Sequence, residues 1–350
     1  MRNPTEVLKN LMEKSKNETY RFQRLYRNLY NPEFYWLAYK NIYANDGSMT
    51  AGADGTTIDG MGNERIERII LSLKDRSYHP KPARREYIAK KNSSKKRPLG
   101  IQSGDDKLVQ EVVKMILESI YEPVFSNKSH GFRPNRSCQT ALKQIQNTFT
   151  GANWFVEGDI HACFDSFDHH AVIDLLKKRI DDEAFIQLIW KFLKAGYMED
   201  EVVYETADGT MQGGVISPLT ANIYLNELDW ELEKENLRFV RYADDSIVMC
   251  RTAQELERAK EVVHRVLAEL GLEVAEDKTG DIDFHDRDFE YLGFTFRHIW
   301  RDSKEEWHYL VRPSNKSFKK FKQDIKARTR KSFSHSFEEW ASELNGSLSS

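Results

Sequence analysis

The sequence RFVRYADDSIVMC, residues 238–250, places two apolar runs on either side of a pair of aspartates, Asp244 and Asp245. Runs of Phe, Val, Tyr and Ile bounded by turn residues predict two strands that meet at an Asp-Asp turn. Two adjacent carboxylates repel each other unless a cation is bound, and hard divalent cations such as Mg²⁺ prefer oxygen ligands. Aspartate is also an ordinary turn residue, so the hairpin alone leaves a purely structural role open.

A second carboxylate lies at the end of another apolar run, NWFVEGDI, residues 153–160. If the fold brings Asp159 beside the Asp244–Asp245 turn, the two sites would hold two metal ions ~4 Å apart, an arrangement that serves phosphoryl transfer. Successive strand residues point to opposite faces, so Asp244 and Asp245 are not expected to be equivalent ligands. Solvated surface carboxylates are the alternative interpretation.

The composition excludes several classes of protein. The 350 residues are 40% hydrophobic with a net charge of −3, which is typical of a globular protein and excludes wholesale disorder. No apolar run is long enough to span a membrane, and the N-terminal segment has no apolar signal-peptide core. Because Cys138, Cys163 and Cys250 form no CxxC pair, we expect neither a disulfide framework nor a structural zinc site, and a cytoplasmic, intracellular location.

The small net charge hides an uneven distribution. Residues 74–97 hold ten basic and two acidic side chains, and residues 311–331 hold nine basic and one acidic. Residues 181–235 hold thirteen acidic and three basic side chains. A single charged run is usually a solvated face, but two basic segments on an acidic body indicate a polyanion bound between separate walls.

Helical and strand patterns are mixed without a βαβ repeat, which predicts an α+β fold. Helices are predicted within residues 5–45, 64–73, 105–121, 169–180, 218–232 and 253–270, and after Pro313. Strands are predicted at residues 85–91, 97–101, 153–160, 291–296 (YLGFTF) and in the two runs of 238–250. Asp105 and Asp168 are the expected N-caps of their helices, Gly271 is expected to end the last one, and the Gly-rich residues 47–62 read as a loop.

RYADD resembles the catalytic motif of reverse transcriptases, and ordered blocks on both sides of it resemble other motifs of that family. The blocks are GADGTTID (52–59), KKRPLGI (95–101) with DDKLVQ (105–110), GFRPNRSCQTAL (131–142), GDIHACFDSFDH (158–169), QGGVISPLTANIYLNELD (212–229), EDKT (276–279) and YLGF (291–294). The first looks like the extra N-terminal motif of group II intron and non-LTR enzymes. The chain looks most like the reverse transcriptase part of a group II intron maturase.

The resemblance implies a right-hand polymerase fold with fingers, a palm built on an antiparallel sheet with helices, and a partial helical thumb. The implied divisions are an N-terminal helical extension with the Gly-rich loop at 1–60, fingers at 61–150, a palm interleaved with the fingers at 151–300, and the start of a thumb at 301–350. Because the sequence ends at ELNGSLSS inside the expected thumb, we expect a truncated piece of a longer protein or a compact relative.

The resemblance also assigns roles around the aspartates. Asp159, Asp244 and Asp245 would be catalytic and would hold two Mg²⁺ ions, for which Mn²⁺ is a substitute, with the backbone carbonyl of Ile160 as a further ligand. The metals would lower the pKa of a primer 3′-hydroxyl and neutralise the departing pyrophosphate. Phe164 would exclude a 2′-hydroxyl and so select dNTPs, although taken without the family a Phe there is more often simple core.

The remaining assignments concern the nucleotide and the nucleic acid. Gln212, Arg97 and Lys90 would bind the dNTP, with Lys91 as the alternative to Lys90. The residues predicted to contact nucleic acid are Gly213, Lys278, Lys316, Lys319, Lys320, Lys322, Arg328, Arg21, Arg24 and Arg27. The three N-terminal arginines have i,i+3 spacing and read as a basic stripe or, equally, as a solvated helix face. Phe318, Phe321 and Ile325 also have helical spacing, which predicts a packing stripe.

The predicted function is RNA-directed DNA synthesis of the group II intron type, with binding of the intron RNA and assistance to its splicing. The expected partners are group II intron RNA, an RNA template with a DNA primer, and dNTPs, without a membrane and with a homodimer left open. Two alternatives stay open: a non-catalytic RNA-binding splicing cofactor, and a reverse transcriptase of a defence or CRISPR locus.

Overall fold

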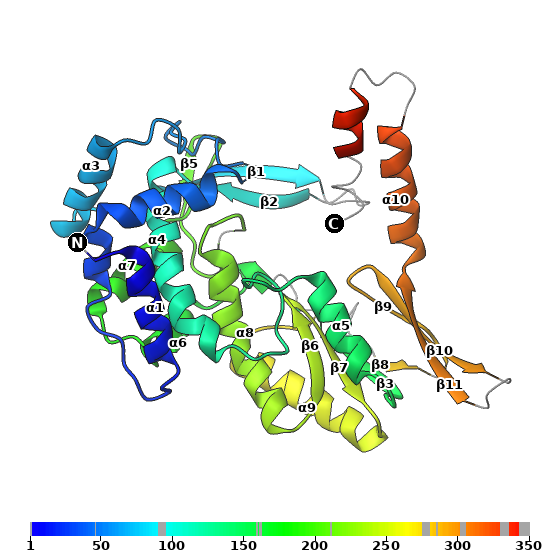
Figure 1. Cartoon of the computed structure of the whole chain (residues 1–350). Helices are drawn as coiled ribbons and strands as arrows, with labels where there is room; N and C mark the ends of the chain where they lie inside the picture. The colour runs from blue at the N-terminus through cyan, green and yellow to red at the C-terminus, as the bar shows by residue number, and fades with distance from the viewer. Residues whose placement is uncertain are drawn as a thin grey trace.

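The computed structural model describes residues 2–45, 47–89, 96–158, 160, 163–210, 212–274, 281–284, 286–301, 306–329 and 336–342, and it has the predicted α+β fold (Figure 1). The α-helices are α1 (Pro4–Ser15), α2 (Pro32–Tyr43), α3 (Asn63–Lys74), α4 (Gly104–Tyr121), α5 (Cys138–Thr148), α6 (His169–Lys177), α7 (Glu183–Lys194), α8 (Ser217–Lys234), α9 (Ala253–Glu269) and α10 (Asn315–Arg328). The 3₁₀ helices are η1 (Tyr26–Tyr30), η2 (Glu122–Val124) and η3 (Cys163–Asp165).

The strands form separate antiparallel and mixed sheets. They are β1 (Ala83–Ala89), β2 (Lys96–Ile101), β3 (Trp154–Gly158), β4 (Tyr197–Glu199), β5 (Val202–Tyr204), β6 (Arg238–Tyr242), β7 (Asp245–Cys250), β8 (Asp281–Asp283), β9 (Phe289–Tyr291), β10 (Phe294–Arg301) and β11 (Glu306–Pro313). We call β6-β7-β3-β8 the central sheet, β2-β1-β4-β5 the hairpin sheet and β11-β10-β9 the C-terminal sheet.

The central sheet is buried on both faces because its side chains alternate between two apolar clusters. On β7, Val248 packs with α8 and α9, whereas its neighbours Ile247 and Met249 pack with α5 and with aromatic residues such as Phe289. The same alternation on β6 directs Arg241 to the face that carries α8. The predicted hairpin of residues 238–250 therefore forms the β6 edge of a sheet that is covered on both faces, with β7 inside the sheet.

The hairpin sheet joins segments that are far apart in the sequence. β1 pairs with β2 in antiparallel register, Ile88 opposite Arg97, and its other edge pairs in parallel with β4. The short β4–β5 hairpin of residues 197–204 was not predicted, because its pairing with β1 is not visible in the local pattern. In Figure 1 this sheet lies above the central sheet. Helix α10 rises directly from the C-terminal sheet, across from the tip of the β1–β2 hairpin.

Three local predictions are wrong. YLGFTF is not one strand: Leu292 and Gly293 have positive φ angles of 49° and 79° and turn the chain between β9 and β10. The N-cap of α4 is Ser103, whose Oγ accepts a hydrogen bond from the Asp106 amide, while Asp105 lies in the first turn.

The predicted helical stripe of Arg21, Arg24 and Arg27 does not form either. Between α1 and η1 the chain is extended where Phe22 bridges to Ile180, and Arg24 has a positive φ of 56°. The buried Phe22 and Leu25 fix this non-helical course, and the three arginines are exposed around it.

Candidate active site

The two predicted aspartates lie at a tight turn of the central sheet. Tyr242, the last residue of β6, pairs with Asp245, the first residue of β7, so the turn itself consists of Ala243 and Asp244. Ala243 is buried with a positive φ of 59°, a conformation that favours glycine or a tight turn. Asp244 is half-buried and Asp245 is exposed. The prediction of a turn is thus confirmed, with Asp245 belonging to the strand.

Neighbouring segments hold this turn closely. Gly131 abuts it: a Cβ added there would lie 2.2 Å from the Ala243 nitrogen. On the other side the Tyr291 hydroxyl donates to the Asp245 carbonyl oxygen at 2.9 Å. A hydrogen bond to Cys138 raises the pKa of Tyr242 to about 12, and this bond ties the end of β6 to the first residue of α5. The backbone of the turn is therefore fixed by contacts from several parts of the chain.

The end of β3 lies beside the turn. Gly158 pairs with Ser246, and the Ser246 Oγ donates to the Gly158 carbonyl oxygen at 3.2 Å. An added Cβ on Gly158 would lie 2.5 Å from that Oγ, so the strands approach closely here. Asp159, which follows in the sequence, lies outside the described residues. Ile160 is buried and bridges to Val274.

The donor chemistry of this edge fits a hard divalent cation, because it consists of carboxylate and carbonyl oxygens. Asp244 forms no ion pair with a Lys or Arg among the residues that the structure describes. Within those residues no group of three or more His, Cys, Asp or Glu side chains is arranged to hold a metal. A metal site here therefore depends on a third carboxylate, for which Asp159 is the predicted candidate.

Two of the predicted nucleotide residues, Gln212 and Arg97, lie at β2. The Gly100 amide donates to the Gln212 carbonyl oxygen at 2.7 Å, so the chain before α8 runs along the free edge of that strand. Gly213 there has φ of 97°, and an added Cβ would lie 2.7 Å from Leu99 Cδ1. Arg97 is exposed further along β2. Lys90 and its alternative Lys91 lie outside the described residues.

Phe164 lies on η3, after β3. Its half-buried ring makes edge-to-face contacts with Phe132 and Phe167, at centroid distances of 6.3 and 6.2 Å. Its carbonyl oxygen accepts a hydrogen bond from the Thr210 amide at 2.6 Å. The adjacent Asp165 accepts a hydrogen bond from Gln212 Nε2 at 3.3 Å. Phe164 and Gln212 thus belong to one connected unit.

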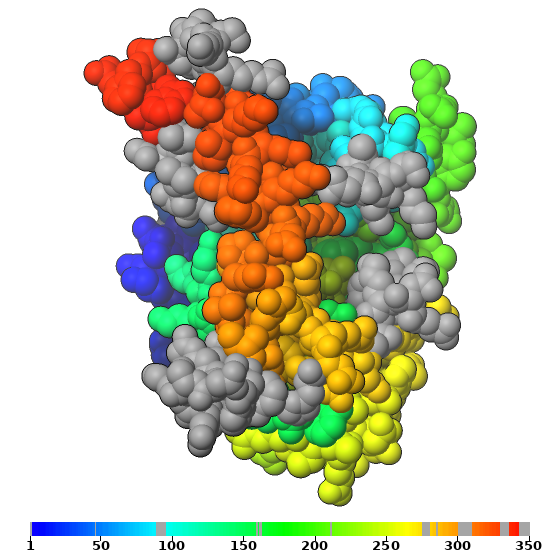
Figure 2. Space-filling model, turned by 90° about the vertical axis from the view of Figure 1, so that its right-hand side faces the viewer, coloured from blue at the N-terminus to red at the C-terminus, as the bar shows by residue number. Residues whose placement is uncertain are grey.

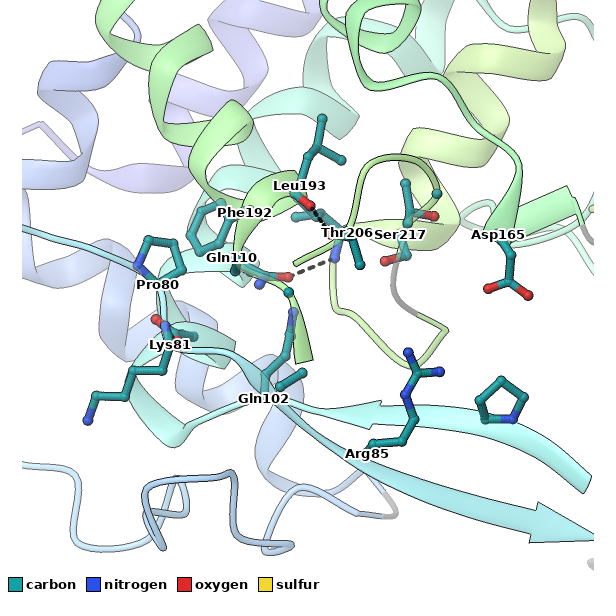
Figure 3. A pocket seen from close by; sticks show the side chains of 18 of the residues that line it. Pro80, Lys81, Arg85, Gln102, Gln110, Asp165, Phe192, Leu193, Thr206 and Ser217 are labelled. Carbon is teal, nitrogen blue, oxygen red and sulfur yellow. Dashed lines mark hydrogen bonds between the residues drawn. The ribbon is translucent and has the colours of Figure 1, made fainter. Parts of the chain in front are cut away.

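A cavity of about 300 Å³ lies against one face of the β1–β2 hairpin (Figure 3). Its lining includes Arg85 and Pro98 of the hairpin, Gln110 of α4, and Asp165. Pro98 and Arg97 are consecutive in β2 and so point to opposite faces. Gln110 Oε1 accepts a hydrogen bond from the Ile216 amide at 3.4 Å at the cavity wall. The cavity is therefore separate from the face of the hairpin that carries Arg97.

The predicted nucleic-acid residues of α10 lie on an outer surface. Figure 2 shows α10 (orange) running from the C-terminal sheet toward the hairpin sheet. Lys316, Lys319, Lys320 and Lys322 are exposed and Arg328 is half-buried. Phe318 and Phe321 are 49% and 41% exposed, so the predicted packing stripe is wrong at these two positions. Lys278 lies outside the described residues. No helix in the described part of the chain is both long and apolar enough to cross a membrane.

Comparison with known proteins shows which sequences this chain is similar to. Residues 88–296 match the family described as "Reverse transcriptase (RNA-dependent DNA polymerase)". The group II intron-encoded protein LtrA of Lactococcus lactis subsp. cremoris is 55% identical over 226 residues, 65% of this chain and 38% of that protein. An uncharacterized 91 kDa protein in the cob intron of Schizosaccharomyces pombe is 42% identical over 79% of this chain and 34% of its own length. The chain thus spans less than two thirds of these relatives.

A solved structure shares the fold at low sequence identity. Telomerase from Candida albicans, in complex with a fragment of telomeric RNA, matches with a TM-score of 0.50 and 11% identity. The match covers 79% of this chain and 54% of that one. At this identity the likeness concerns the fold alone, and it agrees with the right-hand arrangement expected from the sequence.

Proposed function

Because the chain belongs to the reverse transcriptase family, we propose that it extends a DNA primer on an RNA template by nucleotidyl transfer from dNTPs. The observation that carries this proposal is the turn of Asp244 and Asp245 beside the end of β3. The second support is that Gln212 bonds both to β2, the strand of Arg97, and to Asp165, which follows β3 in the sequence. Reverse transcriptases use divalent metal ions, and the donor oxygens fit such ions.

The proposed metal site comprises Asp159, Asp244, Asp245 and the Ile160 carbonyl, and it takes two Mg²⁺ ions that Mn²⁺ can replace. When bound, the ions supply charge stabilisation for phosphoryl transfer. The chain itself orients the triphosphate through Arg97 and the proposed Lys90. Gln212, fixed by its bonds to β2 and Asp165, positions the nucleotide.

Phe164 is proposed to exclude ribonucleotides. Its ring is fixed by Phe132 and Phe167, so it cannot swing aside without breaking those contacts. Phe164→Ala should raise the incorporation of NTPs relative to dNTPs, whereas Phe164→Tyr, which keeps a ring, should keep the discrimination. Unchanged NTP exclusion in Phe164→Ala would remove this assignment.

We further propose that the protein binds a group II intron RNA and assists its splicing, in the cytoplasm. Two observations support this proposal. The similar protein LtrA is named as a group II intron-encoded protein, and exposed lysines lie along α10. The proposed fingers at 61–150, palm at 151–300 and thumb from 301 would enclose the template and primer. A homodimer stays a prediction, which sedimentation velocity tests.

Primer extension on an RNA template tests the polymerase. Asp244→Asn and Asp245→Asn should each reduce dNTP incorporation at least about 100-fold, because each removes a charge that the reaction needs. Asp200→Asn, at the exposed β4–β5 turn, is the matched control and should keep full activity. Full activity in the Asp244 and Asp245 variants would refute the site.

The RNA that copurifies with the protein distinguishes the maturase proposal from a non-catalytic splicing cofactor and from a defence enzyme. An intron RNA domain that copurifies with the protein, together with extension activity, supports the maturase proposal. Intron RNA binding without extension by the unmodified protein would indicate a non-catalytic splicing cofactor. A short unrelated noncoding RNA would indicate a defence enzyme.

A further inference from the structure

Arg241 is a fully buried charge next to the catalytic turn. Its side chain is 0% exposed, as is that of its partner Asp229 on α8. Arg241 Nε and Nη2 donate to the two Asp229 carboxylate oxygens at 2.8 and 2.6 Å, a bidentate pair. A bidentate arginine–carboxylate pair fixes both direction and distance.

The same guanidinium reaches the turn itself. Arg241 Nη1 donates to Asn222 Oδ1 at 2.9 Å and to the Ala243 carbonyl oxygen at 2.8 Å. Asn222 Nδ2 in turn donates to the carbonyl oxygen of Gly131 at 2.8 Å. Gly131 is the residue whose absent side chain lets this segment approach Ala243. The side chains of Arg241 and Asn222 thus join helix α8, the segment before α5 and the β6–β7 turn.

Stability alone does not account for this arrangement. Removing two charges from water is costly, and replacing a buried ion pair by apolar residues of similar volume is often neutral or stabilising. What apolar residues cannot supply is a directed bond to the Ala243 carbonyl. That carbonyl belongs to the peptide that leads into Asp244, and Ala243 is in the left-handed region, where a non-glycine residue needs support from its surroundings.

We propose that Arg241, held by Asp229 and Asn222, is a positioning residue that orients the Asp244 and Asp245 carboxylates for cation binding and nucleotidyl transfer. The inference rests on the proposed polymerase function. A lysine cannot replace it, because an ammonium is a point charge and cannot bridge a carboxylate, an amide oxygen and a turn carbonyl in one plane. The effect should appear in turnover more than in substrate binding.

The test is the double variant Arg241→Met/Asp229→Leu, which replaces both charged side chains with apolar ones. We expect a folded protein with a lowered melting temperature, because Asn222 Oδ1 and the Ala243 carbonyl oxygen lose their donor. The KM for dNTP and the Kd for primer–template should stay within about twofold. The value of kcat should fall at least tenfold, because a misplacement of about 1 Å costs up to about 10² in rate. Mn²⁺ binding without dNTP, followed by electron paramagnetic resonance, should weaken at least fivefold.

The control is Arg297→Met/Asp288→Leu, a pair whose side chains are 37% and 32% exposed. This pair is also bidentate, with Arg297 Nε and Nη2 donating to Asp288 at 2.6–3.0 Å, but it lies at the C-terminal sheet and makes no recorded bond to the turn. Its kcat and Mn²⁺ binding should stay at the unmodified values. A purely structural role of Arg241 predicts that kcat and Mn²⁺ binding also stay at the unmodified values in the folded Arg241→Met/Asp229→Leu protein.

A second variant tests the proposal if the double variant does not fold. Asn222→Ala leaves the Arg241–Asp229 pair and removes one arm of the network, so it should lower kcat about three- to tenfold in a folded protein. Unmodified kcat and Mn²⁺ binding in the folded double variant, or in Asn222→Ala if the double variant does not fold, overturns the proposal. If the unmodified protein does not extend a primer, the proposed function fails instead.

Discussion

Gly131→Ala tests how closely the turn is packed. An added Cβ would lie 2.2 Å from the Ala243 nitrogen, 2.9 Å from its Cα and 3.0 Å from its Cβ, and these are backbone or short side-chain atoms that cannot rotate away. Ordinary van der Waals contact begins at 3.4 Å, so one of the two segments must move by about 1.2 Å. Since Gly131 also accepts the Asn222 bond, the movement should reach the turn.

Two magnitudes follow from that displacement. Overpacking of this kind costs about 1–3 kcal/mol of the free energy of unfolding. A shift of about 1 Å at the reacting groups costs up to about 100-fold in kcat, equal to about 2.7 kcal/mol in the barrier. We expect a folded protein with a lower melting temperature and a much lower kcat.

Single-nucleotide incorporation on an RNA template, measured beside thermal unfolding, checks both values. Gly62→Ala is the control for kcat: Gly62 has an extended φ of −154°, and no atom lies within 4 Å of an added Cβ. A Gly131→Ala protein with the kcat of the unmodified chain would show that the segments separate without moving the aspartates, and so would refute the reasoning.

Further predictions concern other parts of the chain. Gly213→Ala should raise the KM for dNTP about tenfold in steady-state extension, because the new Cβ meets Leu99 at 2.7 Å and φ is 97°; an unchanged KM would contradict a nucleotide role for this edge. Burial lowers the pKa of His130, so between that value and ~6.5 the unfolded chain binds the extra proton and stability falls as pH decreases. Urea unfolding at pH 7 and pH 5 should show this loss, and His130→Gln should reduce it. Lys319→Ala and Lys320→Ala should each weaken template–primer binding at every sequence tested and lower the slope of log K against log salt by about 0.7–0.9; an unchanged slope would mean that α10 does not contact phosphates.

Much of the fold was predictable where the signal is local. The hairpin of residues 238–250, the helix that Gly271 terminates and the Asp168 N-cap are all confirmed, because strand propensity, left-handed glycine and side-chain capping act within a few residues. The β4–β5 hairpin was missed because its stabilising partner, β1, is about a hundred residues away. YLGFTF was misread because Leu292 adopts a positive φ that its residue type does not suggest.

The residues of the candidate site were predictable from the sequence, but the residues that hold them in place were not. Asp244, Asp245 and Gln212 were identified from motifs, and the structure brings Gln212 to Asp165 and to β2. Arg241 was missed, although a charge inside the apolar run RFVRY is a signal that it needs a buried partner. That the partner is Asp229 follows only from the packing of β6 on α8.

The order of the central sheet has a consequence for synthesis. β3 lies between β7 and β8, and both neighbours are encoded well after it. At about 5–20 residues per second, the roughly 90 residues between β3 and β7 take about 4–18 s to emerge, and during that time an apolar strand has two unpaired edges. Such strands promote aggregation. Expression that slows translation between residues 158 and 245 should therefore reduce the yield of folded protein, and a coexpressed chaperone that covers exposed apolar strands should restore it.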